Sequence, residues 1–196
     1  MALSIRWFGD VGQPPGICEV PLETFTPALD HLAGLSDHLV VLGTSKGAEA
    51  ALLLAVRDPR IRTVVALSPT SVVWESVGST GGPRSSWTSA GTPLPFVPYD
   101  PTWTGQEEPP AFRSLYEQSL TAFPGAVAAA TIPVEQIRGQ VLLSAGGDDR
   151  VWPSHRFAAD IVARRAAHGR DDLPRLRCRR RPRAVSRTID PVGRRW

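Results

Sequence analysis

The chain has 196 residues, 42% of them hydrophobic, and that length allows one domain with a substantial core rather than two. Residues 170–196 hold ten arginines against three aspartates, whereas residues 1–169 carry a balance of −4, so we do not expect the body of the protein to bind nucleic acid. Because it has no apolar run of membrane-spanning length, no signal-peptide pattern and no cysteines at disulfide or metal-ligand spacing, we expect a cytoplasmic protein with no metal and no cofactor.

The hydrophobic pattern predicts strands and helices in alternation. Residues 2–8 are expected to form a short strand, and apolar residues recur at helical spacing through 21–35. Continuous apolar runs predict buried strands at 38–42, 62–67 and 140–144, and helices are predicted at 48–56 and 154–168. This order is typical of the α/β class, with a mostly parallel sheet flanked by helices.

A long excursion, residues 68–131, separates the second buried strand from the third. It is rich in Pro, Gly, Ser and Trp, and a segment of this length without periodicity is usually a lid, a binding excursion or disordered. The aromatic residues within 93–99 are unusual for a solvated linker, so we expect an ordered cap. We expect one domain over 1–172, followed by an arginine-rich tail, 173–196, without helical or strand periodicity.

The motif Gly43-Thr44-Ser45-Lys46-Gly47 lies between a predicted strand and a predicted helix. A serine on such a turn is a nucleophile elbow, because small flanking residues allow the sharp change of direction and the hydroxyl of Ser45 is lifted above the sheet. The helix N-terminus and the backbone N–H of Lys46 can then stabilise an oxyanion. The motif can also match by chance, but the flanking strand and helix favour the elbow.

The third buried strand ends in Gly146-Gly147-Asp148-Asp149, at the sheet edge where α/β proteins place catalytic groups. Asp149 would orient and stabilise the imidazole of a serine triad. The alternative is that the two aspartates only cap the helix near Ser154. Because they follow an elbow in the chain order serine, then acid, we favour the catalytic role for Asp149.

No histidine occupies a convincing base position in the sequence. A triad of this chain order needs a histidine beyond the acid, after the next strand. His31 and His38 precede the elbow, and His155 comes only six residues after the acid. His168 is a weak candidate for the base. It is predicted at the end of a helix, where a histidine is more simply explained by its interaction with the helix dipole.

The run 42–49 resembles the C-terminal catalytic domain shared by acyl-CoA thioester hydrolases and bile acid-CoA:amino acid N-acyltransferase. Lys46 and Glu49 make this match more specific to that family than a general esterase elbow would be. Further matching blocks are Phe8-Gly9, 20–23 with Phe25, 71–74, 132–137 and 143–154. The resemblance extends over residues 5–168, with these blocks in order.

This resemblance implies an α/β-hydrolase fold with a Ser, Asp, His triad, in which Ser45 is the nucleophile and Asp149 the acid. It implies an acyl-CoA or other acyl ester as substrate. An apolar acyl chain needs apolar walls, so the excursion is expected to face it, with Trp74 and Trp87 as candidate pocket residues.

The chain departs from that family at both ends, so we expect a truncated domain. The family's strand and glycine-rich loop that supply a second oxyanion donor have no counterpart before Ser45. The family's final strand and Gly-Ala-Gly-His-like loop are missing after Asp172, where residues 178–184 stand instead. Read one base later, suitable codons for those residues encode Ala-Gly-Ala-Gly-His-Ala, so we hypothesise that the tail is an out-of-frame reading. The alternative is a solvated basic tail that binds polyanions.

The sequence therefore predicts a serine hydrolase that cleaves acyl-CoA thioesters to free fatty acid and CoA through an acyl-enzyme on Ser45. Because the nucleophile is serine rather than cysteine, the resemblance favours hydrolysis over acyl transfer to an amine. A carboxylesterase or dienelactone-hydrolase-like enzyme on the same fold is the second interpretation. A non-catalytic truncated homologue is the third.

Overall fold

The computed structural model describes residues 1–77, 82–105, 111–170 and 177–179. In chain order its elements are β1 (Val20–Pro21), the 3-10 helix η1 (Leu22–Phe25), α1 (Thr26–Ala33), β2 (Leu39–Thr44), α2 (Lys46–Arg57), β3 (Ile61–Leu67), β4 (Trp87–Ser89), β5 (Thr92–Pro93), α3 (Arg113–Ala122), α4 (Pro124–Ala130), the 3-10 helix η2 (Val134–Gln136), β6 (Gln140–Gly146), α5 (Ser154–Ala167) and β7 (Arg177–Arg179). None of the described helices is long and apolar enough to cross a membrane.

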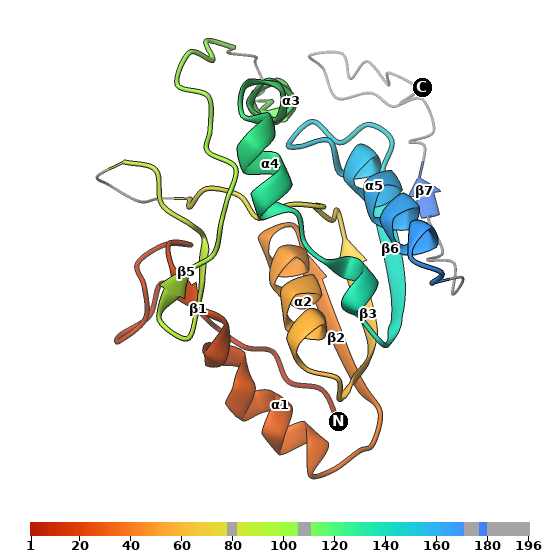
Figure 1. Ribbon diagram of the computed structural model, residues 1–196. Helices are drawn as coiled ribbons and strands as arrows, with labels where there is room; N and C mark the ends of the chain where they lie inside the picture. The colour runs from red at the N-terminus through yellow and green to blue at the C-terminus, as the bar shows by residue number, and fades with distance from the viewer. Residues whose placement is uncertain (78–81, 106–110, 171–176, 180–196) are drawn as a thin grey trace, which may run out of the picture.

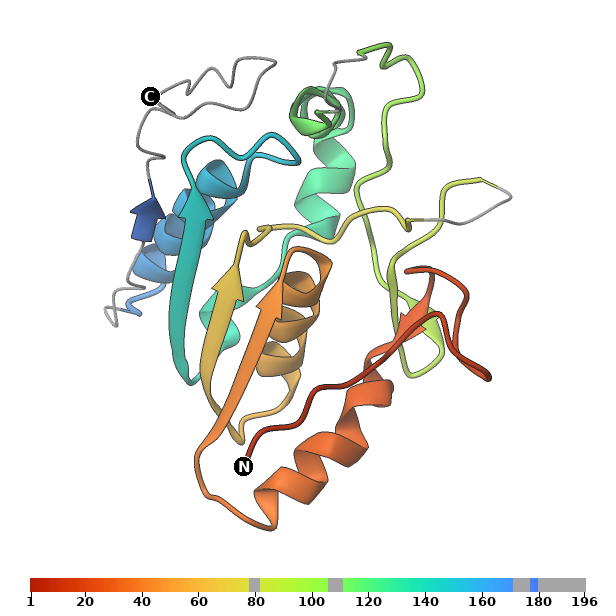
Figure 2. The ribbon, with the colours of Figure 1, turned by 180° about the vertical axis from the view of Figure 1, so that it is seen from behind.

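The main sheet confirms the predicted α/β class. Its strands run in the order β2-β3-β6-β7, and every neighbouring pair is parallel. Because each new strand is added on the same side, right-handed connections bring the intervening helices to one face of the sheet. Helices α2 and α5 lie on this face (Figure 1), and the view from behind shows the strands in front of both helices (Figure 2).

Helix α2 is the centre of the core. The helix carries alanine and leucine side chains on nearly all of its sides, as expected of a helix that is enclosed by protein. Its buried residues are Lys46, Ala48, Glu49, Ala50, Ala51, Leu52, Leu53, Leu54 and Ala55. Strands β2 and β3 pack on one side of it, and η1 and η2 contact it elsewhere. Lys46 and Glu49 are the charged exceptions in this apolar environment.

The opposite face of the sheet is open in the described part of the chain. Successive side chains of a strand point to opposite faces, and on β2 the outward pair, Val40 and Leu42, is 51% and 63% exposed. Val64 of β3 points to the helix side and is fully buried. No described helix covers the strands in the view of Figure 2.

The excursion packs as an ordered body in its described parts. Strands β4 and β5 extend a second small sheet that begins with β1, in the order β1-β4-β5. Trp74, Tyr99 and Tyr116 form an aromatic cluster whose ring centroids lie 4.7–6.1 Å apart. Trp152, in the loop before α5, joins this cluster through Tyr116 at 5.5 Å. The excursion is therefore tied to the loop that follows β6.

Three elements differ from the sequence prediction. Residues 2–8 form no strand; they contribute side-chain contacts instead, and the Trp7 ring packs against Phe25 and Trp87. The helical pattern of 21–35 divides into η1 and α1. A short strand, β7, occurs in the tail where no periodicity predicted one, because parallel pairing with Ser144–Gly146 uses backbone groups whatever the side chains are.

Strand β7 occupies the position beside β6, on the side away from β3. It therefore stands in the sheet where the resemblance called for the family's final strand. The remainder of the arginine-rich tail, 171–176 and 180–196, lies outside the described residues. The expectation of an out-of-frame tail therefore falls mainly on residues that the structure does not describe.

Candidate active site

Ser45 sits on a strained strand-to-helix turn. Its φ of 55° and ψ of −121° lie in a region that non-glycine residues rarely adopt. Its backbone N–H donates to the carbonyl of Leu67 at 2.9 Å, and its own carbonyl accepts from the amides of Ala48 and Glu49. The side chain is half-buried, and its hydroxyl has no hydrogen-bond partner among the described residues. Backbone bonds on both sides thus hold the turn while the hydroxyl stays available.

Gly43 explains why this turn needs a glycine before the serine. A Cβ added at Gly43 would lie 2.0 Å from the carbonyl oxygen of Gly47 and 2.7 Å from the amide nitrogen of Ala48. No real Cβ approaches backbone atoms so closely, so the first turn of α2 can pass over β2 only if position 43 has no side chain. A Cβ at Gly47, in contrast, meets nothing within 4 Å.

The Lys46 amide is the oxyanion donor that the turn offers. Lys46 is the first residue of α2, so its N–H is one of the helix amides that have no acceptor within the helix. The partial positive charge of the helix N-terminus adds to the same location. An oxygen that becomes negative beside Ser45 would therefore be stabilised there.

The Lys46 side chain points away from the turn into the core. Its Nζ lies 3.2 Å from Glu49 Oε2 and donates to Ser86 Oγ at 2.7 Å and to the Glu75 carbonyl at 3.2 Å. Burial lowers the pKa of Lys46 and raises that of Glu49, and their mutual attraction opposes both shifts. Sequence reasoning missed Ser86 and Glu75; the signal available was a lysine at the start of an otherwise apolar helix, where a buried charge needs partners.

Asp149 lies at the same edge of the sheet as Ser45. Parallel strands present their carboxyl ends together, and β3 separates β2 from β6, so the two strand ends are roughly 10 Å apart. Asp149 Oδ1 accepts from the amides of Val151 and Trp152, and Oδ2 accepts from Ser154 Oγ at 2.6 Å. The carboxylate therefore organises the loop that leads into α5, but it bonds loop amides and a hydroxyl rather than backbone amides of the helix, so it is not the cap that the alternative expected. Its role as the catalytic acid stays a prediction.

The histidines lie elsewhere. His38 precedes β2, at the opposite end of that strand from Ser45, and is exposed. His168 follows the last residue of α5, and its Nδ1 is 2.8 Å from the Arg164 carbonyl. Helix α5 has 14 residues, which places its end roughly 21 Å from its start beside Asp149. The weak candidate base is thus a helix-end partner in this structure.

Of the remaining histidines, His155 is on the first turn of α5, near the edge that carries Ser45, and His31 is in the last turn of α1. Both side chains are exposed. Neither ring has a hydrogen bond to Ser45 or to Asp149 in the described structure. The structure thus brings together the turn and the acid loop at one edge but adds no histidine to them.

Trp74 and Trp87 lie in the core, where they bind Glu49. Both are fully buried. The Trp74 backbone N–H and the Trp87 indole N–H donate to Glu49 Oε1 at 3.0 and 2.9 Å. Neither residue lines the apolar groove beside α1 or the two cavities at Pro59 and at Pro133. Both residues thus supply the donors that a buried carboxylate needs. Their role as walls of an acyl pocket stays a prediction.

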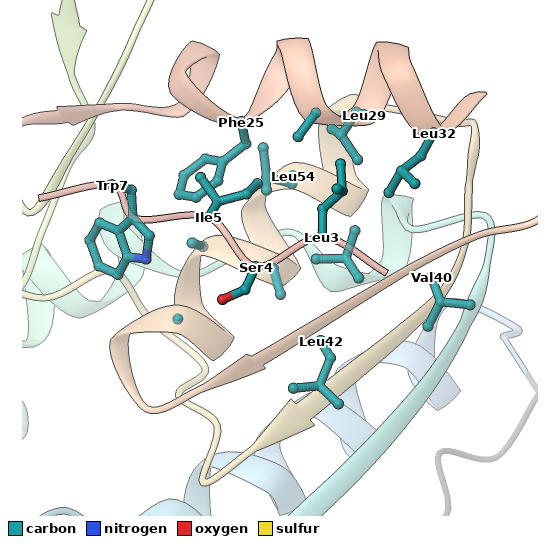
Figure 3. A pocket seen from close by; sticks show the side chains of 15 residues that line it. Leu3, Ser4, Ile5, Trp7, Phe25, Leu29, Leu32, Val40, Leu42 and Leu54 are labelled. Carbon is teal, nitrogen blue, oxygen red and sulfur yellow. The ribbon is translucent and has the colours of Figure 1, made fainter. Parts of the chain in front are cut away.

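An apolar groove of about 390 Å³ lies beside the turn (Figure 3). Leu29 and Leu32 of α1 and Leu54 of α2 form its upper wall, and the extended residues 3–7 cross it. It reaches the elbow at Gly47.

Among the described residues, no group of three or more His, Cys, Asp or Glu side chains is arranged to hold a metal ion.

Residues 20–178 match the sequence model of the family described as BAAT / Acyl-CoA thioester hydrolase C terminal. The match begins at β1 and ends within β7, so it covers most of the chain, including the turn and the acid loop. A search of curated proteins found none that matches the chain.

Proposed function

Because the chain belongs to the family of BAAT and acyl-CoA thioester hydrolase C-terminal domains, we propose that it is a serine hydrolase that acts on acyl-CoA thioesters. The observation that supports this proposal best is the conformation of Ser45, whose strained backbone presents a free hydroxyl beside the first amide of α2. Strain of this kind persists where it serves a function. The acid loop at the same sheet edge adds to the argument.

The reaction follows from these groups. The Ser45 oxygen attacks the thioester carbonyl carbon and gives up its proton, and the carbonyl oxygen becomes an oxyanion that the Lys46 amide stabilises. Collapse of this intermediate breaks the carbon–sulfur bond and releases CoA as a thiolate, which is a better leaving group than an amine. Water then attacks the acyl-enzyme ester, which frees the fatty acid and returns the proton to Ser45.

The proton acceptor is the weak point of this site. All four histidines of the chain are among the described residues, and none contacts Ser45. Loss of one triad member typically leaves a residual acceleration of about 10³–10⁴ over water, from the oxyanion donor and binding. We therefore expect slow hydrolysis that depends on a base from solution.

The test measures thiol release from a long-chain acyl-CoA, with and without added imidazole, and labelling by a fluorophosphonate probe. We expect slow release that imidazole accelerates beyond the rate without protein, and in S45A both signals should fall to the protein-free background. H155Q should keep the wild-type rate, because that ring has no contact with the turn. A short aryl ester run in parallel separates a thioesterase from a carboxylesterase.

The lack of a histidine at Ser45 favours a second candidate, a homologue that folds without catalysing the reaction. In that case wild type and S45A release thiol at the same rate, both with and without imidazole, and the probe labels neither. That result would refute the hydrolase proposal.

A further inference from the structure

Lys46 and Glu49 form a buried ion pair next to the serine. Lys46 is the single lysine of the chain, and its side chain is 9% exposed, while that of Glu49 is fully buried. In the reaction proposed above, Lys46 takes part only through its backbone N–H. The two charged side chains therefore have no part yet in the function.

The pair connects three segments that are distant in the sequence. From α2, Lys46 Nζ reaches Ser86 Oγ and the Glu75 carbonyl. Glu49 Oε1 accepts from the Trp74 amide and the Trp87 indole. Two segments of the excursion, residues 74–75 and 86–87, are thus bonded to the first turn of α2.

Ser86 closes the network. Its hydroxyl accepts from Lys46 Nζ at 2.7 Å and lies 2.9 Å from the Trp74 carbonyl and 3.0 Å from the Glu75 carbonyl, to which it can donate. Directional bonds of this kind hold a backbone in one place, whereas apolar contacts of the same volume would hold it less specifically.

Stability alone does not account for such a pair. Removing two charges from water costs free energy, and apolar residues of similar volume are often as stabilising as a buried ion pair or more so. An arrangement that is costly to bury and adjacent to a strained serine is better explained by what it positions. The position concerned is that of the amide next to Ser45.

We propose that Lys46 and Glu49 are positioning residues that hold the Lys46 amide in the place where it binds the oxyanion, by anchoring the first turn of α2 to residues 74–75 and 86–87. The inference rests on the proposed function for its catalytic consequence, but the anchoring itself does not. Neither side chain touches the substrate, so their loss changes the rate of the chemical step and not substrate binding.

The experiment compares K46M, E49M and the double variant K46M/E49M. Each single variant leaves one buried charge unpaired, so both should lower Tm markedly. The double variant should recover part of the Tm lost in the single variants, because neither charge is left unpaired, while the Trp74 amide and the Trp87 indole still lack their acceptor. In the double variant kcat for thiol release should still fall at least about tenfold, with KM unchanged.

A second readout does not require activity. The amides of Ala48 and residue 49 bond to the Ser45 carbonyl, so their hydrogen exchange reports on the first turn of α2. We expect exchange at both to quicken about tenfold in K46M/E49M, by more than any loss of global stability accounts for. If wild type shows no thiol release, the proposed function fails, and this readout alone still tests the anchoring.

The matched control is R113M/E117M, which removes an exposed ion pair of α3. It should change neither exchange nor rate. If K46M/E49M recovers Tm together with wild-type exchange and kcat, the pair only fills space and the positioning role is refuted. The same conclusion follows if the double variant is no more stable than the single variants, because the pair would then serve stability.

Discussion

At the scale of single residues, the two glycines of the serine motif have different tasks. Both are small residues that the motif demands, yet only Gly43 is in a place where a methyl group would collide with backbone. Gly47 is on the first turn of α2 and has open space around it. A pattern of identical residues therefore hides one steric requirement and one position that tolerates a side chain.

This difference predicts opposite results for two alanine variants. G43A should lower the free energy of unfolding by about 3 kcal/mol or prevent folding, because backbone must move to admit the Cβ. G47A should be neutral or stabilising by up to about 1 kcal/mol, because alanine is the better helix former. Urea denaturation of both variants checks this. Equal losses in the two would contradict the steric argument.

At the scale of elements, α5 is attached to the entrance of β6 by two neighbouring arginines of unlike environment. Arg165 is fully buried, and its guanidinium donates to the carbonyls of Val134, Ile137 and Gly139. Arg164 is partly exposed and pairs with Glu135. The buried arginine satisfies backbone groups that have turned away from regular structure, so it is part of the fold and not of the surface.

The two arginines should respond differently to replacement. R165M should lower the free energy of unfolding by about 3 kcal/mol or more, because three buried carbonyls lose a donor. R164M should cost less than about 1 kcal/mol, because its ion pair is at the surface. Thermal denaturation of both variants makes the comparison. A larger loss for R164M would contradict the assignment of roles.

The loss in R164M should also depend on pH. The Arg164 guanidinium holds the pKa of Glu135 below its ordinary value. The ion pair therefore contributes stability above the ordinary pKa of a glutamate, and this contribution disappears as the pH falls through the lowered pKa. Wild type and R164M should thus converge in stability at low pH, whereas R165M should remain less stable throughout.

At the scale of the whole molecule, the described chain is a sheet with helices on one face only. The outward residues of β2, Val40 and Leu42, are more than half exposed, and β2 is also at the edge of the sheet. An exposed apolar face at a sheet edge promotes self-association. The chain should therefore bind a hydrophobic dye more strongly than a protein with two covered faces.

Replacement of the open face tests this prediction. V40T/L42T should reduce dye binding and light scattering and change the free energy of unfolding by less than about 1 kcal/mol, because threonine suits an exposed strand position. V64T on the covered face is the matched control; it should cost about 1–3 kcal/mol because its hydroxyl is buried. Unchanged dye binding in the double variant would mean that the face is covered in solution.

Much of the fold and part of the site could be inferred from sequence because the signals are local. Apolar runs and helical periodicity predicted β2, α2, β3, β6 and α5, and the serine motif predicted a turn between β2 and α2. The formation of each of these elements depends on residues a few positions apart, which a sequence pattern records directly. Residues 2–8 had the pattern of a strand but form none, because pairing needs a partner strand as well as a pattern.

By itself, the sequence determined the α/β class and the turn at Ser45, since both depend on short-range sterics and periodicity. Only the tertiary structure decided that Asp149 lies two strands from Ser45, that Trp74 and Trp87 bond to Glu49 in the core, and that His168 is at the far end of α5. These relations join residues separated by dozens of positions, and they are set by the order in which strands add to the sheet and by which side chains a buried charge requires.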